Sequence, residues 1–394
     1  MRISLFTNEY PPHVYGGAGV HVEYLARELA RADRGSHEVE VLCFGEQRSV
    51  SGNLSVTGIG APAAIEAADP RHSKLFDTLA RDLAMAGAAT RPDIVHCHTW
   101  YAHMAGLLAR PLTGAKLVLT THSLEPHRPW KEEQLGSAYR ATSWIERTVY
   151  GNADGVIAVS QAMKADVESL YGVDPARVRV IHNGIDTDEY ARRPAPEVLA
   201  RVGIDPSVPM VLFVGRITRQ KGIMHLVRAL PLFDAGMQVV LCAGAPDTPE
   251  IAAEMATEVE RARASSRVAI HWLPEMLTKA DAIALYSEAS LFVCPSVYEP
   301  FGIINLEAMA CETPVVASAV GGIPEIIVDG ETGMLIPPGD PEAIARAVNA
   351  LMADPARRAR MAVAGRARAE EKFSWTSIAA RTLEFYAELI QQRA

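Results

Sequence analysis

The sequence predicts an α/β protein made of two doubly wound halves, each a parallel sheet with helices on both faces. Apolar segments typical of buried strands alternate with helical patterns along the chain, which favours parallel strands joined by crossover helices. At 394 residues the chain is long for a single core. The alternation restarts after a proline-rich segment at residues 193–209. We therefore place a hinge there and expect two Rossmann-like domains that face each other across a cleft.

The elements are expected in the following order. In the first half, strands are expected at residues 2–7, 38–44, 93–96, 116–121, 155–159 and 178–182, with helices at 20–32, 73–86, 101–109, 138–153 and 161–170. In the second half, strands are expected at 209–214, 238–243, 268–270, 291–294, 314–317 and 333–336. We predict an N-terminal domain over residues 1–183, a C-terminal domain over 184–373, and an amphipathic last helix over 374–394.

Composition narrows the class of protein. The net charge is −9 at pH 7, and because nucleic acids and anionic membranes attract basic surfaces, neither is expected as a partner. The five cysteines are widely spaced without a C-x-x-C pair, which favours buried free thiols in a reducing cytoplasm. No apolar run has the length of a signal peptide core or a membrane span. We expect a cytoplasmic protein and leave its oligomeric state, homodimer included, open.

The most informative segment runs from Ser296 to Glu307, where a buried strand leads through a loop into a helix. Glu299 precedes a proline, which disfavours helical backbone and leaves its carboxylate in the loop. Gly302 allows close backbone approach, and the helix start at Ile303 offers N–H groups to an anion. The spacing of the two glutamates is weak evidence alone, since helical glutamates are usually solvated. In this context, however, carboxylates that accept from hydroxyls beside donors for phosphate describe a sugar-nucleotide site.

A second loop in the same half carries the complementary charge. Arg216 and Lys221 follow the strand at 209–214 and precede a helix start. A guanidinium fork and an ammonium suit a diphosphate and would stabilise a departing nucleoside diphosphate. Two solvated loop cations are the alternative. A glycine turn at residues 320–325 is interpreted as mainly architectural.

The first loop of the chain, residues 8–19, is rich in glycine. Gly16, Gly17 and Gly19 allow close backbone approach where a helix begins at the mouth of the sheet, the position at which doubly wound folds bind ligands. The dinucleotide fingerprint G-x-G-x-x-G is absent, which counts against a dehydrogenase. A purely structural turn is the alternative.

Histidines follow the expected strand at 93–96. His96, His98 and His103 lie beside Trp100 and Tyr101. A metal site is the less favoured interpretation, because no carboxylate or thiolate set completes it. Hydrogen bonding within the cleft, or to sugar hydroxyls against the aromatic rings, is preferred.

His122 ends the strand at 116–121, and an imidazole at a strand end in a cleft is more often functional than structural. The loop that follows, residues 124–135, contains Arg128 and Lys131. A loop of that length is usually functional or disordered, and its cations could receive an anionic acceptor. The alternative is a solvated lid edge.

Together these motifs resemble those of the retaining glycosyltransferases of the GT-B fold, family 4. The resemblance covers nearly the whole chain and looks closest to the actinobacterial type of the glycogen synthase branch, whose members include ADP-glucose-dependent α-maltose-1-phosphate synthases. The segments that carry it are Glu9-Tyr10-Pro11-Pro12 with Gly16-Gly17-Ala18-Gly19, Thr121-His122-Ser123-Leu124-Glu125-Pro126, Arg128-Pro129-Trp130-Lys131, Gly215-Arg216 with Lys221-Gly222, and the corner from Glu299 to Glu307.

The resemblance implies a role for each matching residue. Arg216 and Lys221 would hold the donor diphosphate, Glu307 the ribose and Glu299 the hydroxyls of the donor sugar, while His122 would lie beside the transferred sugar. Further donor contacts are implied for Gly17, Phe301, Gly302 and Ile303, acceptor contacts for Glu9, Tyr10, His98, Arg128 and Lys131, and catalytic roles for His122, Arg216, Lys221 and Glu299. The last helix would cross back onto the first domain.

One segment departs from the family pattern. Bacterial glycogen synthases typically carry a Lys-x-Gly-Gly element in the first loop, whereas here Val14-Tyr15 precede Gly16-Gly17. The lysine contact is therefore missing, which weakens the case for transfer onto long glucan. The basic loop at Arg128 and Lys131 instead favours a small phosphorylated acceptor.

The expected activity is transfer of glucose from ADP-glucose to glucose-1-phosphate, to an α-glucan or to both, with retention of configuration and without a metal or other cofactor. Nothing in the sequence places the two carboxylates about 5 Å apart that a retaining glycosidase uses. Front-face transfer is therefore preferred, in which the leaving phosphate helps to deprotonate the acceptor. The alternatives are a family 4 transferase that uses UDP-glucose or UDP-N-acetylglucosamine on another small acceptor, and a non-catalytic nucleotide-sugar sensor.

Overall fold

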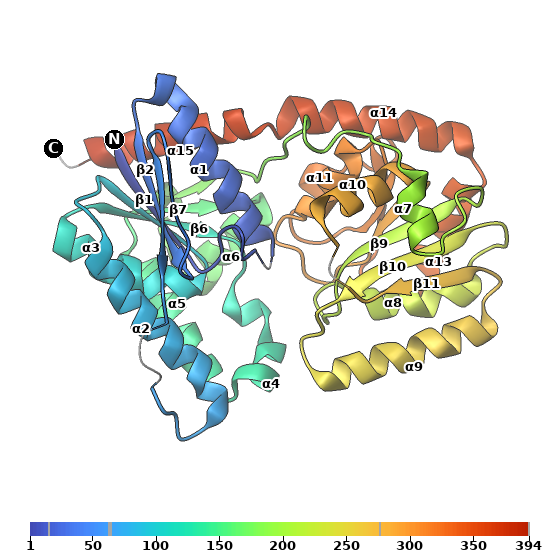
Figure 1. The fold of residues 1–394 in the computed structure, drawn as a ribbon, viewed down its shortest axis with the longest axis horizontal. Helices are drawn as coiled ribbons and strands as arrows, with labels where there is room; N and C mark the ends of the chain where they lie inside the picture. The colour runs from blue at the N-terminus through green and yellow to red at the C-terminus, as the bar shows by residue number, and fades with distance from the viewer. Residues whose placement is uncertain (15, 62–64, 276, 393–394) are drawn as a thin grey trace. The chain divides into compact units, whose positions relative to one another are not determined.

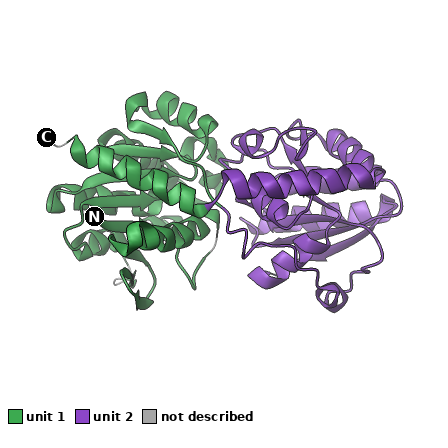
Figure 2. Cartoon of the chain, turned by 90° about the horizontal axis from the view of Figure 1, so that it is seen from above, with its two compact units in different colours: residues 1–184, 375–394 green, residues 185–374 purple. Residues whose placement is uncertain are grey.

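The computed structural model describes residues 1–14, 16–61, 65–275 and 277–392 of the chain. The chain divides into two compact units, one of residues 1–184 with 375–394 (unit 1) and one of residues 185–374 (unit 2), as Figure 2 shows. Each unit is an open sheet covered by helices (Figure 1), which confirms the predicted α/β class with two Rossmann-like sheets.

The sheet of unit 1 has the strand order β3-β4-β2-β1-β5-β6-β7-β8. Its strands are β1 (Arg2–Thr7), β2 (Glu38–Phe44), β3 (Arg48–Ser51), β4 (Leu54–Ile59), β5 (Ile94–His98), β6 (Lys116–Thr121), β7 (Gly155–Ala158) and β8 (Val178–Val180). Neighbouring strands pair in parallel, apart from the antiparallel pair of β3 and β4. The strand order reverses between β1 and β5, and the carboxyl ends of such strands are where doubly wound sheets bind ligands.

Helices pack on both faces of this sheet. They are α1 (Gly17–Gly35), α2 (Ser73–Ala88), α3 (His103–Thr113), α4 (Glu132–Leu135), α5 (Ala138–Asn152), α6 (Gln161–Tyr171) and α15 (Trp375–Gln391). Apolar side chains of α1 and α15 join one core cluster with β1 and β2, so both helices cover the same face (Figure 1). The last helix of the chain is therefore part of unit 1. Trp375 at its start lies so close to Gly184 that an added Cβ there would be 2.6 Å from the indole ring.

All six strands predicted for the first half are present, with small shifts at their ends. The prediction missed β3 and β4, which form an antiparallel pair at the sheet edge. Every residue of β3 is exposed. An edge strand without a buried face carries no alternating apolar pattern, so this one gave no signal in the sequence.

The sheet of unit 2 is wholly parallel, with the strand order β11-β10-β9-β12-β13-β14. Its strands are β9 (Met210–Arg216), β10 (Gln238–Gly244), β11 (Ala269–Leu273), β12 (Leu291–Cys294), β13 (Val315–Ser318) and β14 (Gly333–Ile336). These are the six strands predicted for this half. The order reverses between β9 and β12, so the ligand position expected for this sheet lies at their carboxyl ends.

The helices of unit 2 are α7 (Pro196–Arg201), α8 (Ile223–Ala229), α9 (Pro249–Ser265), α10 (Lys279–Glu288), α11 (Ile303–Ala310), α12 (Ile323–Ile326), α13 (Pro341–Met352) and α14 (Pro355–Lys372). Helices α8, α9 and α13 bury their apolar residues in one core cluster with β9 and β10. Asp340 caps α13, because its Oδ1 accepts from the N–H of Ala343 at 2.9 Å and Pro341 occupies the first turn. The proline-rich segment predicted as a hinge contains the short helix α7.

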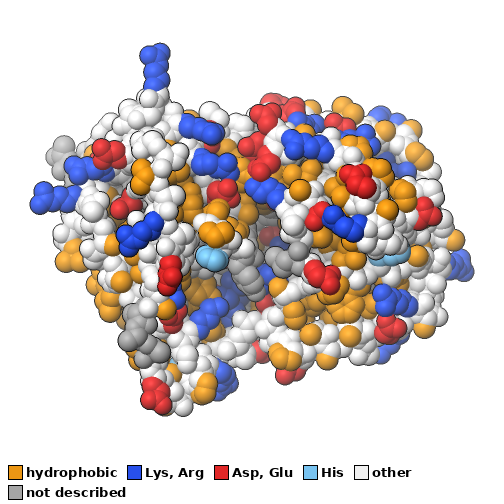
Figure 3. Space-filling model, in the orientation of Figure 1, with side chains coloured by type: hydrophobic (Ala, Val, Ile, Leu, Met, Phe, Trp, Pro, Cys, Tyr) orange, Lys and Arg blue, Asp and Glu red, His pale blue; other side chains and the backbone are white. Residues whose placement is uncertain are grey.

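The five cysteines are all buried free thiols, as predicted. Within the described part of the chain, no helix is both long enough and apolar enough to cross a membrane. On the face drawn in Figure 3, acidic and basic side chains are interspersed rather than gathered by sign.

Candidate active site

In unit 2, the predicted cationic loop and acidic corner meet where the strand order reverses. Strands β9 and β12 are neighbours, so the loops that follow them leave the sheet side by side. The Nζ atom of Lys221 lies 2.7 Å from Oε2 of Glu299, and the two side chains are only 18% and 7% exposed. The structure therefore brings two predicted site residues into a single ion pair.

The backbone and side chain of Glu299 are both fixed by neighbours. The hydroxyl of Ser296 donates to Oε2 of Glu299 at 3.1 Å, and the N–H of Gly322 donates to its carbonyl at 3.0 Å. Gly321 has a φ of +56°, and a Cβ added there would lie 1.9 Å from the same carbonyl oxygen. The glycine turn that we interpreted as architectural thus holds Glu299 in place.

Arg216 is the last residue of β9. Its Nη1 lies 3.1 Å from Oδ1 of Asp247, and the side chains are 23% and 12% exposed. A guanidinium carries five N–H donors, and this contact engages one of them. Asp247 therefore orients the fork of Arg216, a partnership that the sequence did not reveal.

The start of α11 follows the corner. Gly302 precedes the helix with a φ of +102°, a backbone conformation that favours glycine, and Ile303 is the first helical residue. The ring of Phe301 is buried and packs edge-to-face against Phe373, with centroids 5.9 Å apart. The Phe301 side chain therefore serves the core, and a donor contact from this residue would come from its backbone.

Glu307 lies further along α11 and is partly buried. The hydroxyl of Tyr286 donates to its Oε2 at 3.1 Å, and Tyr190 is a second hydrogen-bond partner. Burial raises the pKa of Glu307, while the two tyrosine hydrogen bonds oppose this shift. The tyrosines come from separate segments of unit 2, so sequence patterns did not connect them with Glu307.

In unit 1, the glycine-rich loop is tied down by Glu9. Its Oε2 accepts from the N–H of Gly16 at 2.7 Å, just before α1 begins at Gly17. Tyr10 is buried in the core, and burial raises its pKa to about 12. Tyr15, where the sequence departs from the family pattern, lies outside the described residues. Glu9 therefore shapes the helix start, while acceptor contacts from Glu9 and Tyr10 stay predictions.

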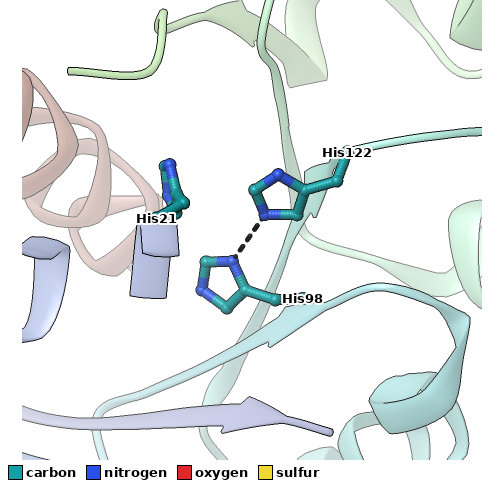
Figure 4. Close-up of side chains that lie close together, drawn as sticks. All are labelled: His21, His98 and His122. Carbon is teal, nitrogen blue, oxygen red and sulfur yellow. Dashed lines mark hydrogen bonds between the residues drawn. The ribbon is translucent and has the colours of Figure 1, made fainter. Parts of the chain in front are cut away.

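The predicted histidines separate into two groups. His96 connects β5 with α15 and β6. Its Nδ1 lies 2.5 Å from the hydroxyl of Tyr386 on α15, and its Nε2 lies 2.7 Å from Oγ1 of Thr120 on β6. His98, at the end of β5, instead faces His122 after β6, with Nδ1 and Nε2 3.0 Å apart (Figure 4).

A histidine from α1 completes the second group. His21 lies with its ring centroid 5.3 Å from that of His98 and 4.8 Å from that of His122. Burial lowers the pKa of His21 to about 4 and the pKa values of His98 and His122 well below the ordinary range. The three imidazoles are therefore neutral at pH 7. The sequence placed His21 on a helix but gave no sign that it would meet two strand-end histidines.

The loop at residues 124–135 is made of short helical turns, η3 (Glu125–His127), η4 (Pro129–Lys131) and α4. The Nζ of Lys131 lies 2.7 Å from Oε1 of Glu125, and their side chains are only 8% and 1% exposed. Oγ1 of Thr142 donates to the other carboxylate oxygen at 3.0 Å. The Lys131 ammonium is thus paired inside the unit rather than solvated.

Arg128 differs from Lys131 in its surroundings. Its side chain is 17% exposed, and Nη1 lies 3.3 Å from the hydroxyl of Ser123 and 3.9 Å from Oε1 of Glu125. At the start of the same turn, the N–H of Glu125 donates to Oε2 of Glu146 at 2.8 Å. Burial, followed by the charge of Glu125, raises the pKa of Glu146 to about 8. Of the two predicted acceptor cations, Arg128 is the more exposed and makes the longer contact with Glu125.

Comparison with known proteins covers both units. The model described as Glycosyltransferase Family 4 matches residues 15–189, and that described as Glycosyl transferases group 1 matches residues 196–368. The chain is 49% identical to an α-maltose-1-phosphate synthase of Mycolicibacterium smegmatis, over 99% of this chain and 100% of that protein. It is 33% identical to a glycogen synthase of Mycobacterium tuberculosis, over 98% of this chain and 94% of that one.

Solved structures share the same architecture. A sucrose-phosphate synthase from Thermosynechococcus elongatus superposes with a TM-score of 0.80 at 25% identity, covering 99% of both chains. The catalytic domain of starch synthase IV from Arabidopsis thaliana, bound to ADP and acarbose, superposes with a TM-score of 0.75 at 18% identity, again over 99% of both chains. The second likeness shows the fold alone.

Proposed function

Because the chain belongs to the family 4 glycosyltransferases, which have the GT-B fold, we propose that it transfers glucose from ADP-glucose to glucose-1-phosphate and so forms α-maltose-1-phosphate. A glucan is the second acceptor of the proposal. The main observation in favour of a nucleotide-sugar donor is the Lys221–Glu299 ion pair, which lies where the strand order of unit 2 reverses. The full-length similarity to the M. smegmatis synthase supports the choice of sugar and acceptor.

The donor is assigned to unit 2. An ammonium has three N–H donors, so Lys221 can keep Glu299 and also contact a phosphate oxygen. The guanidinium of Arg216, oriented by Asp247, and the first-turn N–H groups of α11 would add further donors. Glu307 would accept from ribose hydroxyls, and Glu299 would accept from hydroxyls of the glucose.

The acceptor is assigned to unit 1. Arg128 is proposed to bind the phosphate of glucose-1-phosphate, because its guanidinium presents a fork that matches phosphate geometry. Lys131 would act indirectly, by holding the turn through buried Glu125. Contacts from Glu9, Tyr10 and His98 to the sugar, and from Gly17 to the donor, are part of the same proposal.

The proposed chemistry is front-face transfer with retention of configuration. The bond between the anomeric carbon and the diphosphate oxygen breaks, and the acceptor hydroxyl oxygen bonds to the same face of that carbon. The hydroxyl proton passes to the leaving phosphate. Arg216, Lys221 and the α11 amides stabilise the charge that develops on the diphosphate, and His122 would contact the transferred sugar. These groups supply the neutralisation, so no metal cofactor is included in the proposal.

The second candidate is a family 4 transferase that uses a UDP-sugar. The deciding experiment combines ADP-glucose or UDP-glucose with glucose-1-phosphate or glycogen and follows release of the nucleoside diphosphate. We expect the fastest release with ADP-glucose and glucose-1-phosphate, and an α-linked disaccharide phosphate by NMR. Faster turnover with UDP-glucose would support the second candidate, whereas activity on glycogen alone would reject the phosphorylated acceptor. Silence in all four mixtures would reject the transferase function.

A further inference from the structure

We propose that His21, His98 and His122 form a binding site for one divalent transition ion of the zinc class, and that the bound ion inhibits the enzyme. The inhibitory part rests on the proposed function, because it depends on a role for His122 beside the transferred sugar. The binding part depends only on the three side chains. The ion is an inhibitor here and not a cofactor.

The spacing of the three rings suits a common ligand. Each residue offers one ring nitrogen, and the three nitrogens all lie within 4.8 Å of one another. The closest pair, Nδ1 of His98 and Nε2 of His122, is 3.0 Å apart. With zinc–nitrogen bonds of about 2.0–2.1 Å, the ligand nitrogens of a tetrahedral site lie roughly 3.3 Å apart. If rotation of the side chains shown in Figure 4 closed the separations of up to 4.8 Å to this value, all three nitrogens would lie at bonding distance of one ion.

The hydrogen bond of His21 determines which of its ring nitrogens has a free lone pair. Nδ1 of His21 lies 2.7 Å from Oδ1 of Asn183, and since an amide oxygen only accepts, Nδ1 carries the hydrogen. The lone pair is then on Nε2, which is the arrangement that partners of metal-binding histidines commonly impose. Asn183 is buried as well, so the orientation is held inside unit 1.

Two nitrogens of the group lack protein partners. Nε2 of His21 and Nε2 of His98 are buried without a hydrogen-bond partner among the residues that the structure describes. A buried polar atom left unpaired destabilises the folded protein. A bound ion would give the His21 nitrogen a partner. The partial exposure of His122 offers the ion a route from solvent.

The ligand type selects the class of ion. Neutral imidazoles suit zinc, copper and nickel, whereas magnesium and calcium prefer oxygen ligands. The three ligands would leave a fourth position to water, as in other three-histidine zinc sites. With its nitrogen on the ion, His122 would no longer be available to the sugar.

Binding is tested without any substrate. The full-length protein, stripped of metal with a chelator, is titrated with Co²⁺ and followed by visible absorption, and Zn²⁺ is then added as competitor. We expect one equivalent of Co²⁺ with the intense absorption of tetrahedral coordination, displaced by Zn²⁺. Only the faint absorption of octahedral Co²⁺, or no saturable signal, overturns the site.

Variants locate the ion. We expect His21→Gln and His98→Gln to weaken Co²⁺ binding at least 10-fold, and His103→Gln, which alters another buried histidine of unit 1, to leave it unchanged. Unchanged binding by His21→Gln overturns the assignment, and the wild-type spectrum decides the question if a variant does not fold. Inhibition of glucosyl transfer by Zn²⁺ should follow the same midpoint as binding. Binding without inhibition would overturn the inhibitory part, while an inactive enzyme with a tetrahedral Co²⁺ spectrum would count only against the proposed function.

Discussion

The ammonium of Lys221 and the carboxylate of Glu299 lie 2.7 Å apart although 78 residues separate them along the chain. Both side chains are largely buried, so each needs the other for charge compensation. A residue proposed to bind the donor diphosphate is thus held in place by a residue proposed to bind the donor sugar. This coupling makes stability and activity respond together when either residue is changed.

Replacement of Lys221 by Met is expected to lower the free energy of unfolding by about 2 kcal/mol, because it leaves Glu299 buried without its cation. Activity should fall at least 100-fold through loss of charge stabilisation on the diphosphate. Urea denaturation and nucleoside diphosphate release measure the two effects. In the double variant with Glu299→Gln, the stability loss should be smaller than the sum of the single losses. Strict additivity would show that the pair does not act as a unit.

Donor affinity should depend on the protonation of Glu307. Burial raises its pKa, so the carboxylate gains a proton as the pH falls from neutral into the acidic range and then accepts fewer hydrogen bonds from ribose. We expect the Kd of the wild type for ADP to rise as the pH falls. Glu307→Gln should bind ADP more weakly than the wild type at neutral pH, with a Kd that is nearly independent of pH. Calorimetric titration at several pH values provides the measurement. An equal pH dependence in both proteins would exclude Glu307 as its source.

Gly321 should tolerate no side chain. Its Cβ would lie 1.9 Å from the carbonyl oxygen of Glu299, so Gly321→Ala must displace the corner that presents Glu299. We expect at least a 10-fold loss of activity and a lower Tm. Gly330→Ala is the matched control, because Gly330 also has a positive φ, but nothing lies within 4 Å of its added Cβ. If the two variants behave alike, backbone strain alone and not contact with Glu299 explains the loss.

Substitutions of Arg128 and Lys131 should affect different properties, the first acceptor binding and the second stability. Arg128→Ala is expected to raise the KM for glucose-1-phosphate at least 10-fold with little change in Tm, because we propose that the guanidinium binds the phosphate of this acceptor. Lys131→Met should mainly lower the Tm, since it removes the nearer of the two cations that contact buried Glu125. Steady-state kinetics and thermal unfolding distinguish the two. An unchanged KM for Arg128→Ala would remove this residue from the acceptor site.

Asp82, on the buried side of α2, should make stability fall as pH rises. It is 1% exposed, and burial raises its pKa well above the ordinary value, although the N–H of Ala105 partly opposes this. Above the unfolded-state pKa of about 3.9 the unfolded chain releases the proton while the folded protein keeps it, so the folded state loses stability up to the folded-state pKa. Asp82→Asn should therefore be more stable than the wild type at pH 7. The difference should disappear near pH 4.

The control for this effect is Asp77→Asn on the same helix. Asp77 is exposed and pairs with Arg81, so its replacement should leave the slope of Tm against pH nearly unchanged. The difference in Tm between Asp82→Asn and the wild type should grow from acidic to neutral pH. A difference that stays constant would exclude Asp82 as the cause.

The sequence predicted the buried strands well because a strand in a parallel sheet is apolar along its whole length. β12 and β14 were predicted with the bounds that the structure shows. β3 was not, because its residues are all exposed. The pattern of apolar residues in a sequence reflects which side chains are buried, and the side chains of this edge strand are not buried.

The candidate site was predictable in part for a related reason. Arg216 and Glu299 stand at strand ends of one doubly wound sheet, and the rules of that fold bring such ends together. The pairing of Lys131 with Glu125 and the meeting of His21 with His98 depend on the packing of helices against neighbouring segments. No local sequence pattern predicts these contacts. The presence of a lysine or arginine in the sequence therefore did not show whether its charge would bind a ligand or pair with a buried carboxylate.

The helix α15 has a consequence for how this protein is made. Unit 1 contains the first strand of the chain and also Tyr386, whose hydroxyl meets His96 of β5. During synthesis, all of residues 185–374 emerge from the ribosome before this last helix does. Unit 2 can therefore fold while the part of the older sheet that α15 will cover, beside α1, is still exposed. The unit that is translated first is thus completed last, and a chain that stops before α15 has all of unit 2 but lacks one helix of unit 1.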